Sequence, residues 1–172
     1  IIYMNSLFLG KKIILFHTFI LICCTSFANV DLLTQARNLQ REGKYDKAIN
    51  AFKNILQQKK ENDLPKQELV MYTEALVQLM NTYQSIGEPE ACVITLQEIY
   101  KTTPILQKQC LRDYYSVMGY ALSRTEKMKE AEETTLKVFT MPLHHATPER
   151  YFRDYAYAAA VFYSNPHYQK EV

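Results

Sequence analysis

The sequence predicts an all-α protein whose helices are arranged in antiparallel pairs. After Asn29, apolar residues recur at spacings of three and four, the period of an amphipathic helix, and no stretch alternates for long with the period of a strand. Glycine and proline residues fall between these apolar stretches, where helices end and begin. The chain has 172 residues, of which 48% are hydrophobic, so it can bury the core that such a fold needs.

The first helix pair lies on either side of Gly43. Its two apolar stripes are Leu32, Leu33, Ala36 and Leu39, then Tyr45, Ala48, Ile49, Phe52, Ile55 and Leu56. Glycine is favoured just past the end of a helix because it enters the left-handed region without steric cost. We therefore expect two antiparallel helices joined by a tight turn.

A polar interval, Lys59–Lys66, separates this pair from a second pair around Gly87. The apolar stripes of the second pair are Leu69, Tyr72, Leu76, Leu79, Met80 and Tyr83, then Cys92, Val93, Leu96, Ile99 and Tyr100. Pro89 falls in the first turn of the later helix, where its missing N–H costs nothing. Pro104 is expected to end that helix.

A third pair is expected to start near Lys108 and to end at Pro142. Its stripes are Leu111, Tyr114, Tyr115, Met118, Gly119 and Leu122, then Met128, Ala131, Thr135, Leu136, Val138 and Phe139. Pro148 is expected to begin one more helix, which runs through Phe162 and ends at Asn165.

The turns of the three pairs share an internal pattern. Gly43-x-Tyr45-x-x-Ala48-x-x-x-Phe52 is the clearest unit, a related pattern begins 44 residues later at Gly87, and a third begins 39 residues after that at Glu126. The first unit resembles the tetratricopeptide repeat, a helix–turn–helix of about 34 residues. The later units match the family less closely, because the third lacks the turn glycine and both spacings are longer.

This resemblance covers residues 29–172 and implies a right-handed superhelical α-solenoid of about three and a half repeats. Helical hairpins of this kind stack because one hairpin alone cannot cover both of its apolar faces. The resemblance also implies that the first helices line a concave groove for a peptide or protein partner. The residues at groove positions are Arg37, Gln40, Asn81, Gln84, Tyr120 and Arg124. The carboxylate clamp of some family members is not expected, because only Asn81 matches its positions.

Residues 1–28 have the composition of a secretory signal peptide. With Met4 as the start, Lys11 and Lys12 precede a 12-residue apolar run, and Ser26-Phe27-Ala28 offers small side chains at a cleavage site. The run would span about 18 Å as a helix, less than the roughly 30 Å of a bilayer core. We expect cleavage after Ala28 and a periplasmic or other extracytoplasmic location. An uncut membrane anchor is the alternative, whereas lipidation at Cys23 or Cys24 lacks the preceding small residue.

The charge of the chain excludes one class of partner. The chain has 20 basic and 18 acidic residues, and two of the basic residues lie in the predicted leader. The remainder is therefore neutral, which gives no electrostatic footprint for nucleic acid. Cys92 and Cys110 are the two cysteines left after cleavage, and we expect buried thiols rather than a disulfide.

No residue pattern in the sequence indicates catalysis, a cofactor or a metal. His144 and His145 are adjacent and therefore point in different directions, which favours a solvated loop over a metal site. The acidic run at Glu130, Glu132 and Glu133 is interpreted as a solvated helix face. The many tyrosines are interpreted as packing between helices, with a ligand-stacking platform as the alternative. We expect a chain that is not an enzyme.

Two functions from different classes fit these observations. The first is a non-catalytic scaffold that binds a protein or peptide. The second is an extracytoplasmic sensor, because exported arrays of this kind resemble the input halves of membrane-bound histidine kinases and regulators in Bacteroidota-type bacteria. We expect the array to continue beyond Val172, and a transmembrane span in that continuation would favour the sensor.

Overall fold

The computed structural model describes residues 32–58, 64–141 and 148–165, and every regular element in these ranges is a helix. This confirms the predicted all-α class. The elements are a helix over residues 32–41, then α2 (Tyr45–Leu56), α3 (Lys66–Ser85), α4 (Pro89–Thr102), α5 (Pro104–Lys108), α6 (Leu111–Ser123), α7 (Met128–Thr140) and α8 (Pro148–Ser164). None of the helices in these ranges combines the length and the apolar character that a bilayer crossing requires. The predicted leader, residues 1–28, lies outside the described residues.

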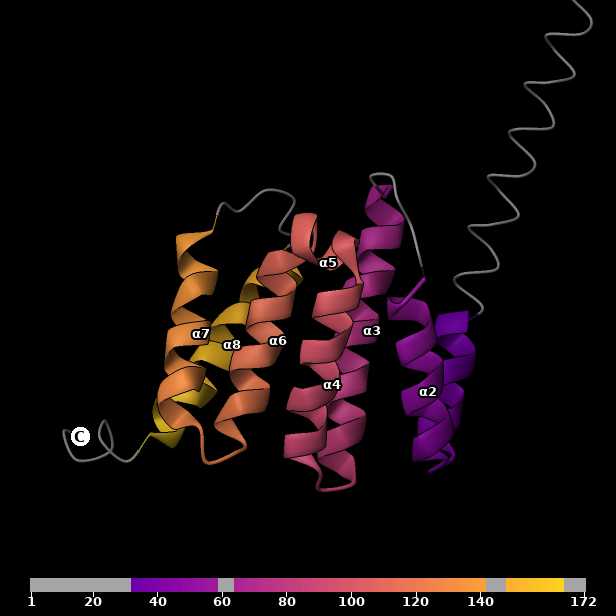
Figure 1. Ribbon diagram of the computed structural model, residues 1–172, viewed down its shortest axis with the longest axis horizontal. Coiled ribbons are helices and arrows are strands. Elements are labelled where there is room, and N and C mark those ends of the chain that lie inside the picture. The colour runs from indigo at the N-terminus through magenta and orange to yellow at the C-terminus, as the bar shows by residue number, and fades with distance from the viewer. Residues whose placement is uncertain (1–31, 59–63, 142–147, 166–172) are drawn as a thin grey trace, which may run out of the picture.

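The helix pairs follow one another along the long axis of the molecule, from the helix over 32–41 and α2 at one end to α7 and α8 at the other, and α8 lies between α6 and α7 (Figure 1). Helix α3 contacts α2 and α4 and also α6, and α6 in turn contacts α4, α7 and α8. In the view of Figure 1, α4 lies in front of α3, and α7 lies in front of α8. Each of the two inner helices, α3 and α6, is therefore covered from several sides.

The turns after the first and third helices contain glycine in the left-handed region, as the sequence predicts. Gly43 has a φ of 73° and Gly87 a φ of 75°. In both turns the chain folds back onto the helix, since Lys44 N–H donates to the Leu39 carbonyl at 2.9 Å and Glu88 N–H donates to the Tyr83 carbonyl at 3.0 Å. These bonds satisfy carbonyls that a helix end would otherwise leave unpaired.

The turn between α6 and α7 has no glycine and uses a side chain instead. The Thr125 hydroxyl donates to the Leu122 carbonyl at 2.7 Å and accepts from the Lys127 N–H at 3.3 Å. This explains how the third pair closes without the glycine found in the first two.

One continuous apolar core connects the pairs, from Ala36 in the first helix to Val161 in α8. Its largest fully buried side chains include Phe52 and Tyr72. The Tyr72 hydroxyl still finds a polar partner, because it donates to the Gln58 carbonyl at 3.2 Å. Burial, together with the charge of Glu68, raises the pKa of Tyr72 to about 12.

Small residues, Gly119 and Ala131, allow α6 and α7 to come into close contact. A β-carbon placed on Gly119 would lie 3.3 Å from the backbone nitrogen of Thr135 and would collide with the Thr135 hydroxyl. Both Gly119 and Ala131 are buried. The two helix axes can therefore approach only because this position has no side chain.

Helix α5 is not predicted from the sequence, because Pro104 is expected only to end the preceding helix. Helix α4 does end at Thr102, but Pro104 also begins a short helix in which Ile105 and Leu106 are buried. The physical reason is the dual effect of proline: it holds Thr103 in an extended conformation and is well suited to the first position of a new helix.

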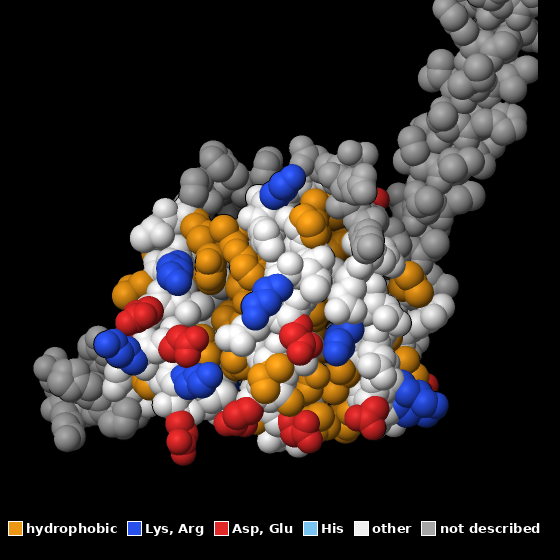
Figure 2. Space-filling model, viewed as in Figure 1, with side chains coloured by type: hydrophobic (Ala, Val, Ile, Leu, Met, Phe, Trp, Pro, Cys, Tyr) orange, Lys and Arg blue, Asp and Glu red, His pale blue; other side chains and the backbone are white. Residues whose placement is uncertain are grey.

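The face in the space-filling view of Figure 2 carries basic and acidic side chains that are interspersed over it. Several acidic side chains follow one another along the lower edge of this face in the view, and most of the basic ones lie above them. Apolar side chains show between them, as on most folded proteins.

Candidate functional site

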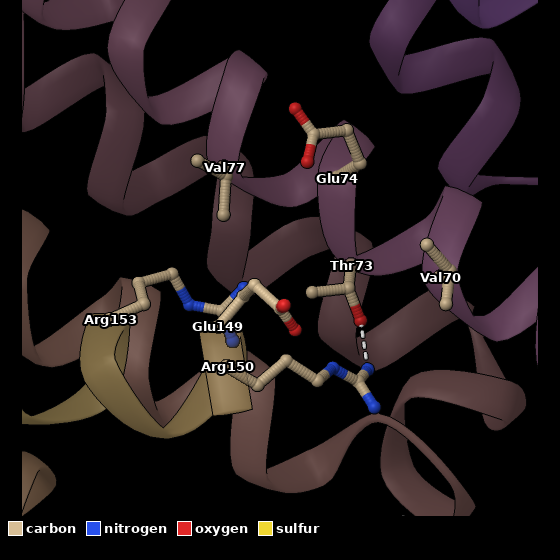
Figure 3. Close-up of a pocket in the computed structure, with 7 residues that line it drawn as sticks. All are labelled: Val70, Thr73, Glu74, Val77, Glu149, Arg150 and Arg153. Atoms are coloured by element: carbon tan, nitrogen blue, oxygen red, sulfur yellow. Dashed lines mark hydrogen bonds between the residues drawn. The ribbon is translucent and has the colours of Figure 1, made fainter. Parts of the chain in front are cut away.

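A cavity of about 420 Å³ lies between α3 and α8. Its seven lining residues are Val70, Thr73, Glu74 and Val77 of α3, and Glu149, Arg150 and Arg153 of α8. The four α3 residues are three, one and three positions apart, so they share one face of that helix. Figure 3 shows the side chains of both helices around the same space, with Val77 and Val70 on either side of Thr73 and Glu74.

A buried carboxylate on α6 holds the two arginines of the cavity. Asp113 is 6% exposed and accepts from Arg150 Nη2 at 2.6 Å and from Arg153 Nη2 at 2.5 Å. Arg150 also donates to the hydroxyl of Thr73 on α3 (Figure 3). One carboxylate therefore connects two guanidinium groups, and residues from α3, α6 and α8 meet at a single point.

Glu74 forms the second polar group of the cavity and connects it to the first helix. Its carboxylate lies 2.5 Å from Arg37 Nη2 and accepts from Gln78 Nε2 at 2.8 Å. Burial acts to raise the pKa of Glu74, but the hydrogen bonds from Gln78 and Arg37 and the charges of Arg37 and Arg153 lower it overall. The charged form of the Glu74 carboxylate is therefore stabilised by Arg37 and Arg153.

A further ion pair fixes α8 beside the cavity. Arg112 Nε of α6 donates to Asp154 Oδ2 of α8 at 2.8 Å. Arg112 Nη1 also donates to the Val138 and Met141 carbonyls at the end of α7, at 2.6 and 3.2 Å. The guanidinium thus caps the carbonyl end of α7, where the Val138 carbonyl also accepts a long hydrogen bond of 3.4 Å from the Met141 N–H.

Three of the six residues predicted to line a groove contact neighbouring helices around this site. Arg37 pairs with Glu74, and Gln40 Nε2 donates to the Thr82 hydroxyl of α3 at 3.0 Å. Tyr120 of α6 stacks on Tyr157 of α8, with ring centroids 4.6 Å apart. These contacts join the helix over 32–41 to α3, and α6 to α8.

The other three predicted groove residues lie elsewhere. Asn81 is half-buried on α3, and Gln84 has a buried amide nitrogen without a hydrogen-bond partner among the described residues. Arg124 is exposed and follows the end of α6. None of the six predicted residues is among the seven that line the cavity.

The sequence patterns do not identify the residues that build the cavity. None of Glu74, Asp113, Arg150 and Arg153 occupies a predicted groove position. One signal was present: α8 has four charged residues in its first two turns and none from Tyr155 to Ser164. Charges confined to one end of a helix indicate a polar contact there, although they do not identify its partner.

Other candidate groups from the sequence have simpler structural roles. Cys92 and Cys110 are free and buried, as predicted, and burial raises the pKa of each thiol to about 12. Tyr114 is buried and stacks on Tyr100 at 4.4 Å, so these rings pack α4 against α6. No group of three potential metal ligands occurs within the described ranges, and His144, His145 and His167 lie outside them.

No family model, curated protein or solved structure matches this chain. The resemblance to the tetratricopeptide repeat therefore depends on the residues of the sequence itself.

Proposed function

We propose that this chain is a non-catalytic scaffold of the tetratricopeptide type, which binds an extended peptide segment of a partner protein. The order of helix contacts supports the stacked arrangement, because α3 and α6 each contact their hairpin partner and the first helix of the next pair. Under this proposal the bound segment lies against the helix over 32–41 and against α3, α6 and α8.

The cavity between α3 and α8 is the observation that carries the proposal. Its volume of about 420 Å³ is within the range typical of ligand sites. Val70 and Val77 suit apolar side chains, whereas Glu74 and Arg153 present charges of both signs to the backbone and polar groups of a peptide. Arg37 already holds Glu74, and Asp113 already holds Arg153. Binding would therefore cost little side-chain conformational entropy.

We also propose that the chain acts outside the cytosol. This part of the proposal rests on residues 1–28 of the sequence, where a basic start, a short apolar run and small residues occur in the order of a signal peptide. The buried, free state of Cys92 and Cys110 is compatible with that location, because their high pKa values keep the thiols protonated and slow to react.

The test of binding is a selection of displayed random peptides on residues 29–172, followed by titration of the selected peptides. The described core lies within 36–161, so this protein keeps all of it. Val70 lines the cavity and is substantially exposed, so Val70→Glu should obstruct the site without disturbing the core. We expect V70E to weaken binding at least tenfold, by about 1.4 kcal/mol or more.

The matched control is Ile94→Glu, which changes an exposed apolar residue of α4 that does not line the cavity. We expect I94E to bind the selected peptides as the unmodified protein does. If V70E and the unmodified protein bound the peptides equally well, the cavity would not be the peptide-binding site. A selection that enriches no peptide would remove the proposal itself.

A further inference from the structure

The Glu74 carboxylate makes its hydrogen bonds through only one of its two oxygens. Arg37 Nη2, at 2.5 Å, and Gln78 Nε2, at 2.8 Å, both contact Oε1. The other oxygen, Oε2, has no hydrogen-bond partner among the residues that the structure describes. Because Glu74 lines the cavity between α3 and α8, Oε2 is available to accept a hydrogen bond from a bound ligand.

The charge that the cavity presents to a ligand is mainly acidic, although two arginines line it. The side chains of Arg150 and Arg153 are only 15% and 17% exposed, and Asp113 holds the Nη2 atoms of both. The side chain of Glu74 is 32% exposed, and Glu149 is an exposed residue of α8 (Figure 3). Glu149 also lies in the first turn of α8, where its charge offsets the positive end of the helix. A cation is therefore favoured over an anion in this cavity.

The contacts of Oε1 determine which kind of cation fits Glu74. A guanidinium group binds a carboxylate best through two parallel hydrogen bonds, one to each oxygen. Arg37 and Gln78 already occupy Oε1, so a guanidinium group of a ligand could use only Oε2. An ammonium group is a compact charge that donates to a single oxygen without this loss. Val70 and Val77 lie on the same face of α3 and suit methylene groups or an adjacent apolar side chain.

We propose that the peptide bound in this cavity places a primary ammonium group against Glu74 Oε2 and apolar groups against Val70 and Val77. This inference rests on the peptide-binding function proposed above and names the charge that the site selects. The ammonium group belongs either to a lysine side chain or to the amino terminus of the peptide, which share the same chemistry. A negative group at this position of the peptide would be repelled by Glu74.

The selected peptides provide the first test, with their binding measured by isothermal titration. We expect them to share a lysine or a free amino terminus beside apolar residues. Norleucine in place of the lysine removes the ammonium group and keeps the methylene chain, whereas acetylation removes the charge of the amino terminus. One of these two changes should weaken binding at least about tenfold, which identifies the source of the ammonium group. Where the source is a lysine, arginine in its place should weaken binding at least about threefold, because Oε1 is occupied.

Two variants of the protein separate a ligand contact of Glu74 from a structural role. Glu74→Gln should weaken binding of the ammonium peptide at least about tenfold and change binding of its uncharged analogue less than about twofold. Arg37→Gln removes a positive charge beside Glu74 and releases Oε1, so it should tighten binding of the ammonium peptide. The matched control is Glu130→Gln, at an exposed acid of α7 that does not line the cavity, and it should leave both affinities unchanged.

The results that would overturn this inference differ from the result that would remove the proposed function. Selected peptides without an ammonium group, or peptides that bind equally well after both chemical changes, would mean that the cavity does not select this charge. Equal losses for the ammonium peptide and its analogue in E74Q, or weaker binding in both E74Q and R37Q, would mean that the ion pair only shapes the site. In each of these cases V70E would still weaken binding, so the peptide site would stand. A selection that enriches no peptide would remove the proposed function and this inference with it.

Discussion

Helices α3 and α8 differ in how they are held in the structure. Nine of the 20 residues of α3 are buried and most of them are apolar, because α2, α4 and α6 surround this helix. Only three of the 17 residues of α8 are buried, and one of them is Asp154. An interior helix is thus fixed by apolar burial, whereas the last described helix is fixed largely by arginine–aspartate pairs with α6.

The largest expected effect tests the apolar side of this comparison. Leu76 is fully buried at the centre of α3, so Leu76→Ala should lower the free energy of unfolding by about 3 kcal/mol, from lost apolar contact and the cavity left behind. Val161→Ala in α8 removes less apolar volume and should cost about 1.5 kcal/mol. Urea denaturation of both variants measures the difference, and an equal cost would mean that α8 depends on apolar burial as strongly as α3 does.

A smaller effect tests the ionic side of the comparison. Asp113→Asn removes the charge that pairs with Arg150 and Arg153, and we expect a cost of about 2 kcal/mol because both guanidinium groups are largely buried. The loss should be concentrated in α8, so limited proteolysis should cut within residues 148–164 first. Glu130→Gln, a change at an exposed acid of α7, is the matched control and should leave the cleavage pattern unchanged.

The smallest effect concerns pH. The pKa of Glu74 is lower in the folded state than its ordinary value of 4.5, so Glu74 contributes stability above pH 4.5 that is lost as the pH falls through its folded value. Arg37 and Glu74 are each about a third exposed, so the contribution should be below about 1 kcal/mol. Thermal unfolding between about pH 7 and pH 3 should show a shallower acid decline for Glu74→Gln than for the unmodified protein. Identical declines would mean that the pair is not formed in solution.

Much of the helical framework follows from local sequence. The spacing of apolar residues identifies the long helices, and Gly43 and Gly87 identify two turns because few other residues accept a positive φ. The burial of Cys92 also follows, since it occupies an apolar stripe. Helix α5 does not follow, because the same proline that ends one helix can begin the next.

The cavity could not be predicted from the sequence in the same way. Thr73 and Arg150 are 77 positions apart, and they meet only because α8 packs on α6 beside α3. The sequence predicts Arg37 and Tyr120 at groove positions, but it does not reveal that Arg37 pairs with Glu74 or that Tyr120 stacks on Tyr157. Those pairings depend on the three-dimensional offset between helices that are distant in the sequence.

The three hydrogen bonds of Arg112 have a consequence for how this end of the molecule fluctuates. The same guanidinium that pairs with Asp154 also caps the carbonyl end of α7. If α8 detaches, Arg112 loses its anionic partner and the last turn of α7 loses the side chain that orders it. The two helices are therefore expected to open as one cooperative unit while the helices from α2 to α4 stay closed.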